Sequence, residues 1–334
     1  MRMNLRRLLL PLVAVASLLL AACGDDSATN DDASADDTGA DDTDAAASTG
    51  PVVIEHAYGT TELDEVPERI VSLNTQWLGA LQALGVEPVG YNVDTLAGPE
   101  GVFPWEEVPE GADAIETSDG LPLEQIAALD PDLILVTYMA ADQETYDQLN
   151  AIAPTIGALG DRQVDTWQEM TTTLGEVVRD PDAAAAVIDD VEGQLAAVAE
   201  ELPGLDGTTF AFANYVPGDS IYVVSDPDDG SSMFFQSLGM EIAPSIIDAG
   251  DGVVGRVQLS FEQVDVLDAD LLVMFTNDGD PSDLPGYDNL PAVQAGAVAH
   301  PDYAEIVGLN TPSPLSIPYS LEAVRPALEA AAGS

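Results

Sequence analysis

Few side chains in this sequence could take part in chemistry. The chain of 334 residues has eight Lys+Arg, two His and one Cys, and every basic residue is an arginine. His56 and His300 have no companions at the spacing of metal ligands, so each is interpreted as a surface or strand-end histidine. No nucleophile–His–acid arrangement is visible, and a lone cysteine cannot form an internal disulfide. These patterns argue against a His-cluster metal site and against a hydrolase.

Arg256 is the side chain best suited to hold a ligand. It is expected to lie in a Gly-rich loop just before Leu259-Ser260, where a helix is expected to begin. A guanidinium group in a half-dry cleft pairs well with an anionic group. The alternative is that it balances loop acids such as Asp251, and Arg162 is a second candidate. The other arginines of the folded part are interpreted as structural or surface residues: Arg69, Arg179 and Arg325.

Aromatic residues near the ends of expected strands form the second group of candidate ligand contacts. Open α/β sheets bind ligands at the ends of their strands, and broad aromatic faces suit large ring systems. The candidates are Trp77, Tyr91, Trp105, Tyr138, Tyr215 and Tyr222. Tyr138, Trp105 and Tyr215 are the preferred three. For each residue the alternative is packing in the core or at the surface.

The elements that would position these residues alternate between short apolar strands and one-faced helices. A hairpin is expected at 52–66, strands at 69–74, 86–91 and 133–137, and helices at 78–84 and 123–129. The scheme restarts after Gly204, with strands at 208–213, 221–224 and 270–275 and helices at 260–267 and 318–332. This βαβ order predicts an α/β fold of two Rossmann-like lobes with parallel sheets. One long Ala-rich helix at 182–202 would join them.

Two segments repeat the same pattern, one in each half. Residues 123–136 and 261–274 both have a glutamate early in a helix, then Asp-x-Asp, then a buried strand. Glu124 and Glu262 therefore occupy equivalent positions. The repeat favours two similar lobes, although these glutamates could be ordinary surface residues.

The net charge of −52 excludes whole classes of partner. With sixty Asp+Glu and no lysine, the chain cannot build a basic stripe against nucleic-acid phosphates or anionic lipid head groups. Repulsion among so many carboxylates destabilises a compact folded state unless salt screens the charges. We interpret this composition as that of a secreted protein bathed in high salt.

The N-terminus has the features of a secretory leader. Arg2, Arg6 and Arg7 precede an apolar run over residues 8–20, which is too short to span a bilayer. The run ends in Leu20-Ala21-Ala22-Cys23-Gly24, which resembles the bacterial lipobox, in which the cysteine is lipidated. Acyl chains on Cys23 would then hold the protein on the membrane.

The residues after Cys23 are acidic and small, with no large apolar side chain before residue 50. Such a segment cannot bury enough surface to become ordered. The expected organisation is a lipoprotein signal peptide at 1–22, an acidic disordered tether at 23–50, an N-terminal lobe at 51–180, an interlobe helix at 181–203 and a C-terminal lobe at 204–334.

Five short motifs follow one another along the folded part of the sequence. They are Pro67-Glu68-Arg69-Ile70-Val71-Ser72-Leu73, Leu84-Gly85-Val86-Glu87-Pro88-Val89-Gly90, Leu129-Asp130-Pro131-Asp132-Leu133-Ile134, Asp268-Ala269-Asp270-Leu271-Leu272 and Thr311-Pro312-Ser313-Pro314-Leu315-Ser316-Ile317-Pro318. In order and spacing they resemble the ferric-siderophore and cobalamin substrate-binding proteins of bacterial ABC importers. The last motif looks closest to the ferric-siderophore branch.

This resemblance implies a rigid interlobe helix, a ligand cleft between the lobes, and neither catalysis nor a cofactor. The ligand would be a ferric-siderophore complex, handed to a permease dimer by a monomer lipid-anchored on the outer face of the cytoplasmic membrane. The resemblance places Arg256 among the residues that line the pocket. It also implies that Glu124 and Glu262 meet arginine clusters on the permease, since such charge-assisted pairs suit reversible docking.

Several alternatives stay open. The same fold could carry cobalamin or haem, and a cell-surface adhesin could use the acidic tether as a stalk. A zinc or manganese binder would require several histidines, which the sequence lacks. A net charge of −52 is awkward for an anionic ligand, and a less charged hydroxamate chelate would avoid that conflict. The sequence does not choose between these chelates.

Overall fold

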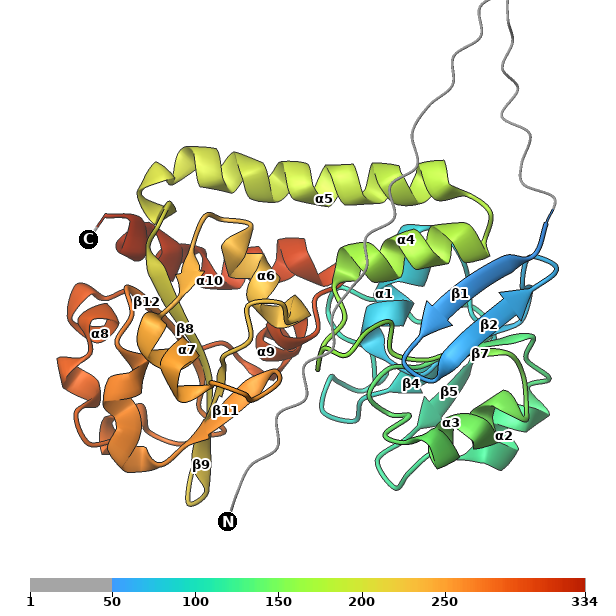
Figure 1. Cartoon of the computed structure of the whole chain (residues 1–334), viewed down its shortest axis with the longest axis horizontal. Helices are drawn as coiled ribbons and strands as arrows, with labels where there is room; N and C mark the ends of the chain where they lie inside the picture. The colour runs from blue at the N-terminus through green and yellow to red at the C-terminus, as the bar shows by residue number, and fades with distance from the viewer. Residues whose placement is uncertain (1–49, 334) are drawn as a thin grey trace, which may run out of the picture. The chain divides into compact units, whose positions relative to one another are not determined.

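The computed structural model describes residues 50–333 (Figure 1). The expected signal peptide, Cys23 and nearly all of the acidic tether lie outside the described residues. The folded part opens with the expected hairpin, in which β1 (Val52–His56) and β2 (Gly59–Leu63) pair antiparallel. Within residues 50–333, no helix has the length and apolarity needed to cross a membrane.

The N-terminal lobe contains a five-stranded parallel sheet in the order β5-β4-β3-β6-β7. Its strands are β3 (Ile70–Ser72), β4 (Gly90–Val93), β5 (Asp113–Glu116), β6 (Leu133–Leu135) and β7 (Thr155–Ile156). Its helices are α1 (Thr75–Ala83), α2 (Leu123–Ala128), α3 (Gln143–Asn150) and α4 (Trp167–Val177). The parallel sheet predicted for this lobe is confirmed.

Both faces of this sheet are covered, which explains why β3 and β6 are buried throughout. Successive residues of a strand point to opposite faces, so they enter different apolar clusters. Ile70 packs with Trp77 on one face, whereas Val71 packs with Ile134 on the other. The short apolar runs in the sequence follow from this two-sided burial.

The C-terminal lobe contains a six-stranded mixed sheet in the order β11-β9-β8-β12-β13, with β10 also paired to β8. Its strands are β8 (Thr209–Val216), β9 (Ser220–Val224), β10 (Glu241–Ile242), β11 (Arg256–Leu259), β12 (Leu271–Phe275) and β13 (Val298–Ala299). Its helices are α6 (Gly230–Gln236), α7 (Pro244–Ala249), α8 (Pro291–Ala295), α9 (Tyr303–Asn310) and α10 (Ser316–Ala332).

The sheet of the C-terminal lobe differs from the all-parallel sheet that the sequence predicted. β9 runs antiparallel to β8, and β11 runs antiparallel to β9. A tight turn joins β8 to β9, with Gly218 at a φ of +80°. A connection this short can only reverse the chain, because a parallel neighbour requires a crossover of a dozen or more residues. The α/β fold with two lobes is confirmed, and one of its sheets is mixed.

One long helix, α5 (Pro181–Glu201), runs across the top of both lobes in Figure 1. Asp180 caps its N-terminus by accepting a hydrogen bond from Ala183 N at 3.0 Å, and Pro181 occupies the first turn, where a proline is tolerated. The helix is 21 residues long, or about 30 Å. It packs against α4 in the N-terminal lobe.

Short 3₁₀ segments replace some of the expected regular structure. They are η1 (Pro203–Leu205), η2 (Phe261–Leu267), η3 (Pro281–Asp283) and η4 (Tyr287–Asn289). The helix predicted over 260–267 is this η2 segment, which is kinked at Gln263. The Gln263 side chain accepts a hydrogen bond from Ser260 N at 3.0 Å, and this capping box fixes the start of the segment.

Candidate functional site

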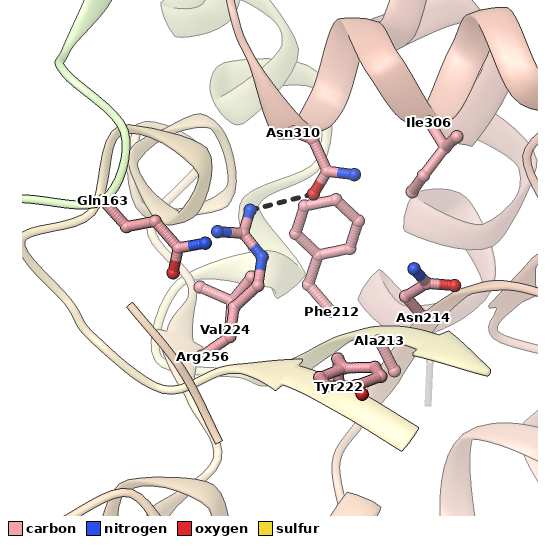
Figure 2. Close-up of a pocket in the computed structure, with 9 residues that line it drawn as sticks. All are labelled: Gln163, Phe212, Ala213, Asn214, Tyr222, Val224, Arg256, Ile306 and Asn310. Carbon is pink, nitrogen blue, oxygen red and sulfur yellow. Dashed lines mark hydrogen bonds between the residues drawn. The ribbon is translucent and has the colours of Figure 1, made fainter. Parts of the chain in front are cut away.

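A cavity of about 270 Å³ opens beside the sheet of the C-terminal lobe (Figure 2). Strands β8, β9 and β11 and helix α9 supply most of its lining, and a loop of the N-terminal lobe supplies Gln163. The lining residues are Gln163, Phe212, Ala213, Asn214, Tyr222, Val224, Arg256, Ile306 and Asn310. The cavity therefore combines apolar walls with three amides, one phenol and one guanidinium group, and both lobes contribute to it.

Arg256 is the charged side chain of this cavity. It is the first residue of β11, where it pairs with Val224 of β9, and is not in a loop as the sequence predicted. Its Nη2 donates to Asn310 Oδ1 at 3.0 Å and to Ser231 Oγ at 3.3 Å. The side chain is 17% exposed. The strand and these bonds hold the guanidinium group at the wall of the cavity.

Asp229 is the counter-charge of Arg256. Its Oδ2 lies 4.0 Å from Arg256 Nη1, and its side chain is fully buried. Asp229 also caps α6, since Oδ1 accepts hydrogen bonds from Ser231 N at 3.0 Å and from the Ser231 hydroxyl. Burial lowers the pKa of Arg256, and the Asp229 carboxylate acts in the opposite direction. The two groups therefore form a partly buried ion pair at the cavity wall.

The loop that carries Gln163 is packed against the C-terminal lobe. Gly230 N, at the start of α6, donates to Val164 O at 2.9 Å. A Cβ atom at Gly230 would clash with the Asp165 carbonyl, so only glycine allows this close approach of the backbones. Figure 2 shows the Gln163 amide pointing toward the Arg256 guanidinium group.

Arg162, next to Gln163, points elsewhere. Its Nη2 donates to Glu169 Oε2 on α4, in an ion pair whose side chains are 28% and 44% exposed. Arg162 is absent from the lining of the cavity. The structure therefore brings Arg256 to this cavity and leaves Arg162 beside it.

A second cluster joins the two lobes through aromatic side chains. Tyr303, on α9, donates to Asp94 Oδ2 in the N-terminal lobe at 2.7 Å. Phe103 and Trp105 stack with ring centroids 4.9 Å apart, and Trp105 also meets Tyr319 of α10 at 5.2 Å. The preferred candidate Trp105 thus lies where the lobes meet.

Tyr138 is the most exposed of the candidate aromatics, with 58% of its surface accessible. It follows β6 directly, and its phenol is close enough to Tyr303 to raise the pKa of that residue, although burial and Asp94 contribute more. Its exposed ring is available at the edge of the aromatic cluster.

Three other candidates are packed inside their lobes. Trp77 is 0% exposed, Tyr91 4% and Tyr215 5%. Tyr215 packs edge-to-face on Phe261, with ring centroids 5.5 Å apart. Trp77 belongs to an apolar cluster of the N-terminal lobe. A side chain with no exposed surface has nothing to offer a ligand in this structure, so Trp77 serves the core, and Tyr91 and Tyr215 are mainly packing residues.

The two glutamates of the internal repeat occupy equivalent places. Glu124 lies in the first turn of α2, which precedes β6, and Glu262 lies in the first turn of η2, which precedes β12. Both are exposed. β6 and β12 each pair in parallel with the first strand of their lobe's main sheet, β3 and β8. The structure therefore gives both glutamates the same position relative to their sheets.

Sequence reasoning missed several residues of the site. Asn310 bonds to Arg256, Asp94 bonds to Tyr303, and Gln163 and Asn214 line the cavity. A weak signal was present for two of them, because Asp94 and Asn214 lie at the ends of strands, where polar residues meet ligands. Asn310 ends a helix that the sequence did not predict, and nothing local distinguishes Gln163.

Comparisons with known proteins agree with this architecture. One relative is the "probable siderophore-binding lipoprotein YfiY" of Bacillus subtilis. It is 27% identical over 231 residues, and the alignment covers 68% of this chain and 69% of YfiY. The ferric enterobactin-binding periplasmic protein FepB of Escherichia coli O6:H1 is 29% identical over 268 residues, covering 74% and 83%.

Solved structures show the same fold. Streptococcus pneumoniae PiaA in complex with ferrichrome superposes with a TM-score of 0.73 at 24% identity, covering 84% of this chain and 99% of its own. A periplasmic solute binding protein from Mycobacterium smegmatis gives a TM-score of 0.71 at 26% identity, covering 85% and 99%. The family described as periplasmic binding protein matches residues 70–303. The chain therefore belongs to the periplasmic binding protein family.

Proposed function

We propose that this protein captures a ferric-siderophore complex outside the cytoplasm and delivers it to the permease of an ABC importer. The observation that carries the proposal is a cavity to which both lobes contribute, with Arg256 and three amides on its wall. Two relatives, YfiY and FepB, are named for binding a siderophore and ferric enterobactin. Their alignments with this chain cover 68% and 74% of its length. The site needs no cofactor, because binding and release are its only tasks.

Within this function, the candidate ligand contacts fall into two groups. Arg256, Asn310 and Gln163 face the cavity from the polar side. Trp105 and Tyr138, where the lobes meet, supply aromatic surface for the periphery of a chelate. Arg162 remains a candidate only if its pair with Glu169 opens.

Small closure movements are expected during capture. The lobes are joined by α5, by the bond from Tyr303 to Asp94, and by the bond from Gly230 N to Val164 O. A helix of 21 residues resists bending more than a flexible hinge strand. The cleft would therefore admit ligand by loop and side-chain adjustment.

Delivery would use Glu124 and Glu262, one on each lobe. Both are exposed and precede equivalent strands, so two arginine clusters on a permease dimer could bind them together. The anchor would be Cys23, outside the described residues, with acyl chains holding the monomer on the outer face of the cytoplasmic membrane.

Tryptophan fluorescence of the full chain, purified in detergent and molar salt, tests the proposal. The panel holds ferric hydroxamate, catecholate and citrate chelates, cobalamin, haem and bare metal ions. Quenching at submicromolar concentration by a ferric chelate is the expected result. Binding of cobalamin or haem alone would replace the ligand, and a folded protein that binds none of the panel would overturn the function.

A further inference from the structure

The positive charge of Arg256 on the cavity wall is already compensated by a carboxylate of the protein itself. Asp229, fully buried, places Oδ2 4.0 Å from Arg256 Nη1. That oxygen accepts no hydrogen bond from any residue in 50–333, so the nearby guanidinium group is what compensates its charge. Arg256 and Asp229 together carry no net charge, and an anionic ligand would have to compete with Asp229 for the same cation.

The hydrogen-bond donors of Arg256 are also partly committed. Nη2 has two hydrogens, and its two partners are Asn310 Oδ1 and Ser231 Oγ. The parallel pair of N–H groups that captures a carboxylate or a catecholate is therefore not freely presented to the cavity. Figure 2 shows the Arg256 guanidinium group lying between Asn310, to which it is hydrogen-bonded, and Gln163.

The other arginines within residues 50–333 are held elsewhere. Arg162 is paired with Glu169, and Arg325 with three glutamates that include Glu201. Arg69 donates to the carbonyl groups of Leu129 and Asp130, and Arg179 donates to those of Gly50 and Asp64. The part of the chain that the structure describes therefore brings no second cation to the cavity, and the chain has no lysine.

Acidic groups lie close to the lobe contact instead. Asp94 accepts the bond from Tyr303, and Glu106 accepts bonds from the Thr75 hydroxyl and from Phe103 N. With the charge of Arg256 compensated by Asp229, the residues that line the cavity carry no net positive charge. The remaining polar lining consists of amides and a phenol, which bind neutral carbonyl oxygens well.

We infer that the ligand of this cleft is a ferric chelate of zero or positive net charge, as ferric trishydroxamates are. Three hydroxamates, each singly negative, neutralise ferric iron, whereas three catecholates, each doubly negative, leave a triply negative complex. The inference rests on the proposed function and narrows it to one class of chelate. A triply negative chelate would find no free cation on the cavity wall to offset its charge, because Asp229 already compensates Arg256.

The test compares two chelates on the wild-type full chain, purified in detergent at constant ionic strength. The probes are ferrichrome, a neutral trishydroxamate, and ferric enterobactin, a triply negative catecholate. We expect ferrichrome to bind tighter by on the order of 100-fold, the scale that misplaced like charges produce. Equal or tighter binding of ferric enterobactin would overturn the charge inference and keep the proposed function. If the protein bound neither of these two chelates and no other ferric chelate, the proposed function itself would be overturned.

A variant pair tests the cause of the selectivity. In D229N the cation of Arg256 loses its counter-charge, while asparagine still caps α6. The ratio of enterobactin affinity to ferrichrome affinity should rise by about 10-fold, the change expected for one uncompensated charge. The matched control is D228N, an exposed acid on the same turn, whose ratio should stay at the wild-type value. An equal rise in D228N would attribute the selectivity to overall charge and overturn the role of the ion pair.

Discussion

Tyr303 of the C-terminal lobe donates a hydrogen bond to Asp94 Oδ2 of the N-terminal lobe, at 2.7 Å and across 209 positions in sequence. Phe103 and Phe275 pack near the Tyr303 ring, at centroid distances of 6.2 and 6.4 Å. Burial, together with Asp94, raises the pKa of Tyr303, so its hydroxyl stays protonated and able to donate over the whole neutral range. This contact therefore links the two lobes through a hydrogen bond to a charged acceptor.

Removing this link should loosen the lobes. Y303F deletes the donor to a charged acceptor, and we expect unfolding in urea to show a loss of about 1–2 kcal/mol. The control is Y222F, which deletes an exposed tyrosine–aspartate bond of similar length, 2.8 Å, within the β8–β9 hairpin of one lobe. The loss in the free energy of unfolding should be smaller for Y222F than for Y303F. A larger loss in Y222F than in Y303F would mean that the interlobe bond contributes little.

Glu106 should make stability depend on pH. Burial is the main cause that raises the pKa of Glu106 to about 7, and the charge of Asp94 adds to it, while bonds from Thr75 and Phe103 oppose it. A raised carboxyl pKa favours the folded state below the unfolded value near 4.5, and this contribution is lost as pH rises to about 7. Denaturation of wild type and E106Q at several pH values should show the free energy of unfolding of wild type falling relative to that of E106Q from pH 4.5 to 7, by up to about 3 kcal/mol. A pH-independent difference would contradict the assignment.

The ion pair at the cavity should behave as one unit. R256Q leaves the buried Asp229 carboxylate without a counter-charge, and we expect a loss of about 3 kcal/mol in the free energy of unfolding. The double variant R256Q/D229N removes both charges and should recover much of that loss. Thermal unfolding of wild type, both single variants and the double variant gives the coupling energy. Additive losses would show that the two charges do not interact.

Much of the fold could be predicted because its signals are local. The run Ile70–Ser72, the leucines of α1 and the Asp180-Pro181 start of α5 are complete within a few residues. Strand β11 could not be predicted from local signals. It follows a Gly-rich segment, and it joins the sheet by pairing with β9, which lies some thirty residues earlier in the sequence. Only tertiary pairing shows that Arg256 begins a strand.

The site was harder to predict than the fold. Arg256 stands out as a candidate because arginine is rare in this chain, and the structure places it on the wall of the cavity. Trp77 lies in α1, and its side chain packs in the core with no exposed surface, which the sequence around it does not reveal. Asn310 and Asp94 are ordinary residues until the fold brings Arg256 and Tyr303 to them. Their roles depend on contacts that no local pattern encodes.

Salt should stabilise the folded chain. The net charge is −52, and removal of the leader would take three arginines and no acids. Screening weakens repulsion between exposed carboxylates as the Debye length falls from about 10 Å at 0.1 M salt to about 3 Å at 1 M. The unfolding temperature measured with sodium chloride should therefore rise over this range. A fall over the same range would contradict the interpretation of a protein adapted to high salt.

Docking on the permease should depend on Glu124 and Glu262 and be separable from ligand binding. Both carboxylates are exposed at equivalent positions, and neither lines the cavity of Figure 2. E124A/E262A should abolish uptake of the ferric chelate into cells while the Kd for the chelate stays within about twofold of wild type, since exposed charges far from a site couple to it weakly.

The control for docking is E144A/E241A, which removes two exposed acids, one from each lobe, without touching the repeat. Its net charge equals that of E124A/E262A, so a general effect of charge on transport would appear in both variants. We expect uptake at the wild-type rate in this control. If E124A/E262A weakens chelate binding as strongly as it weakens uptake, the glutamates act on the cleft and not on the permease.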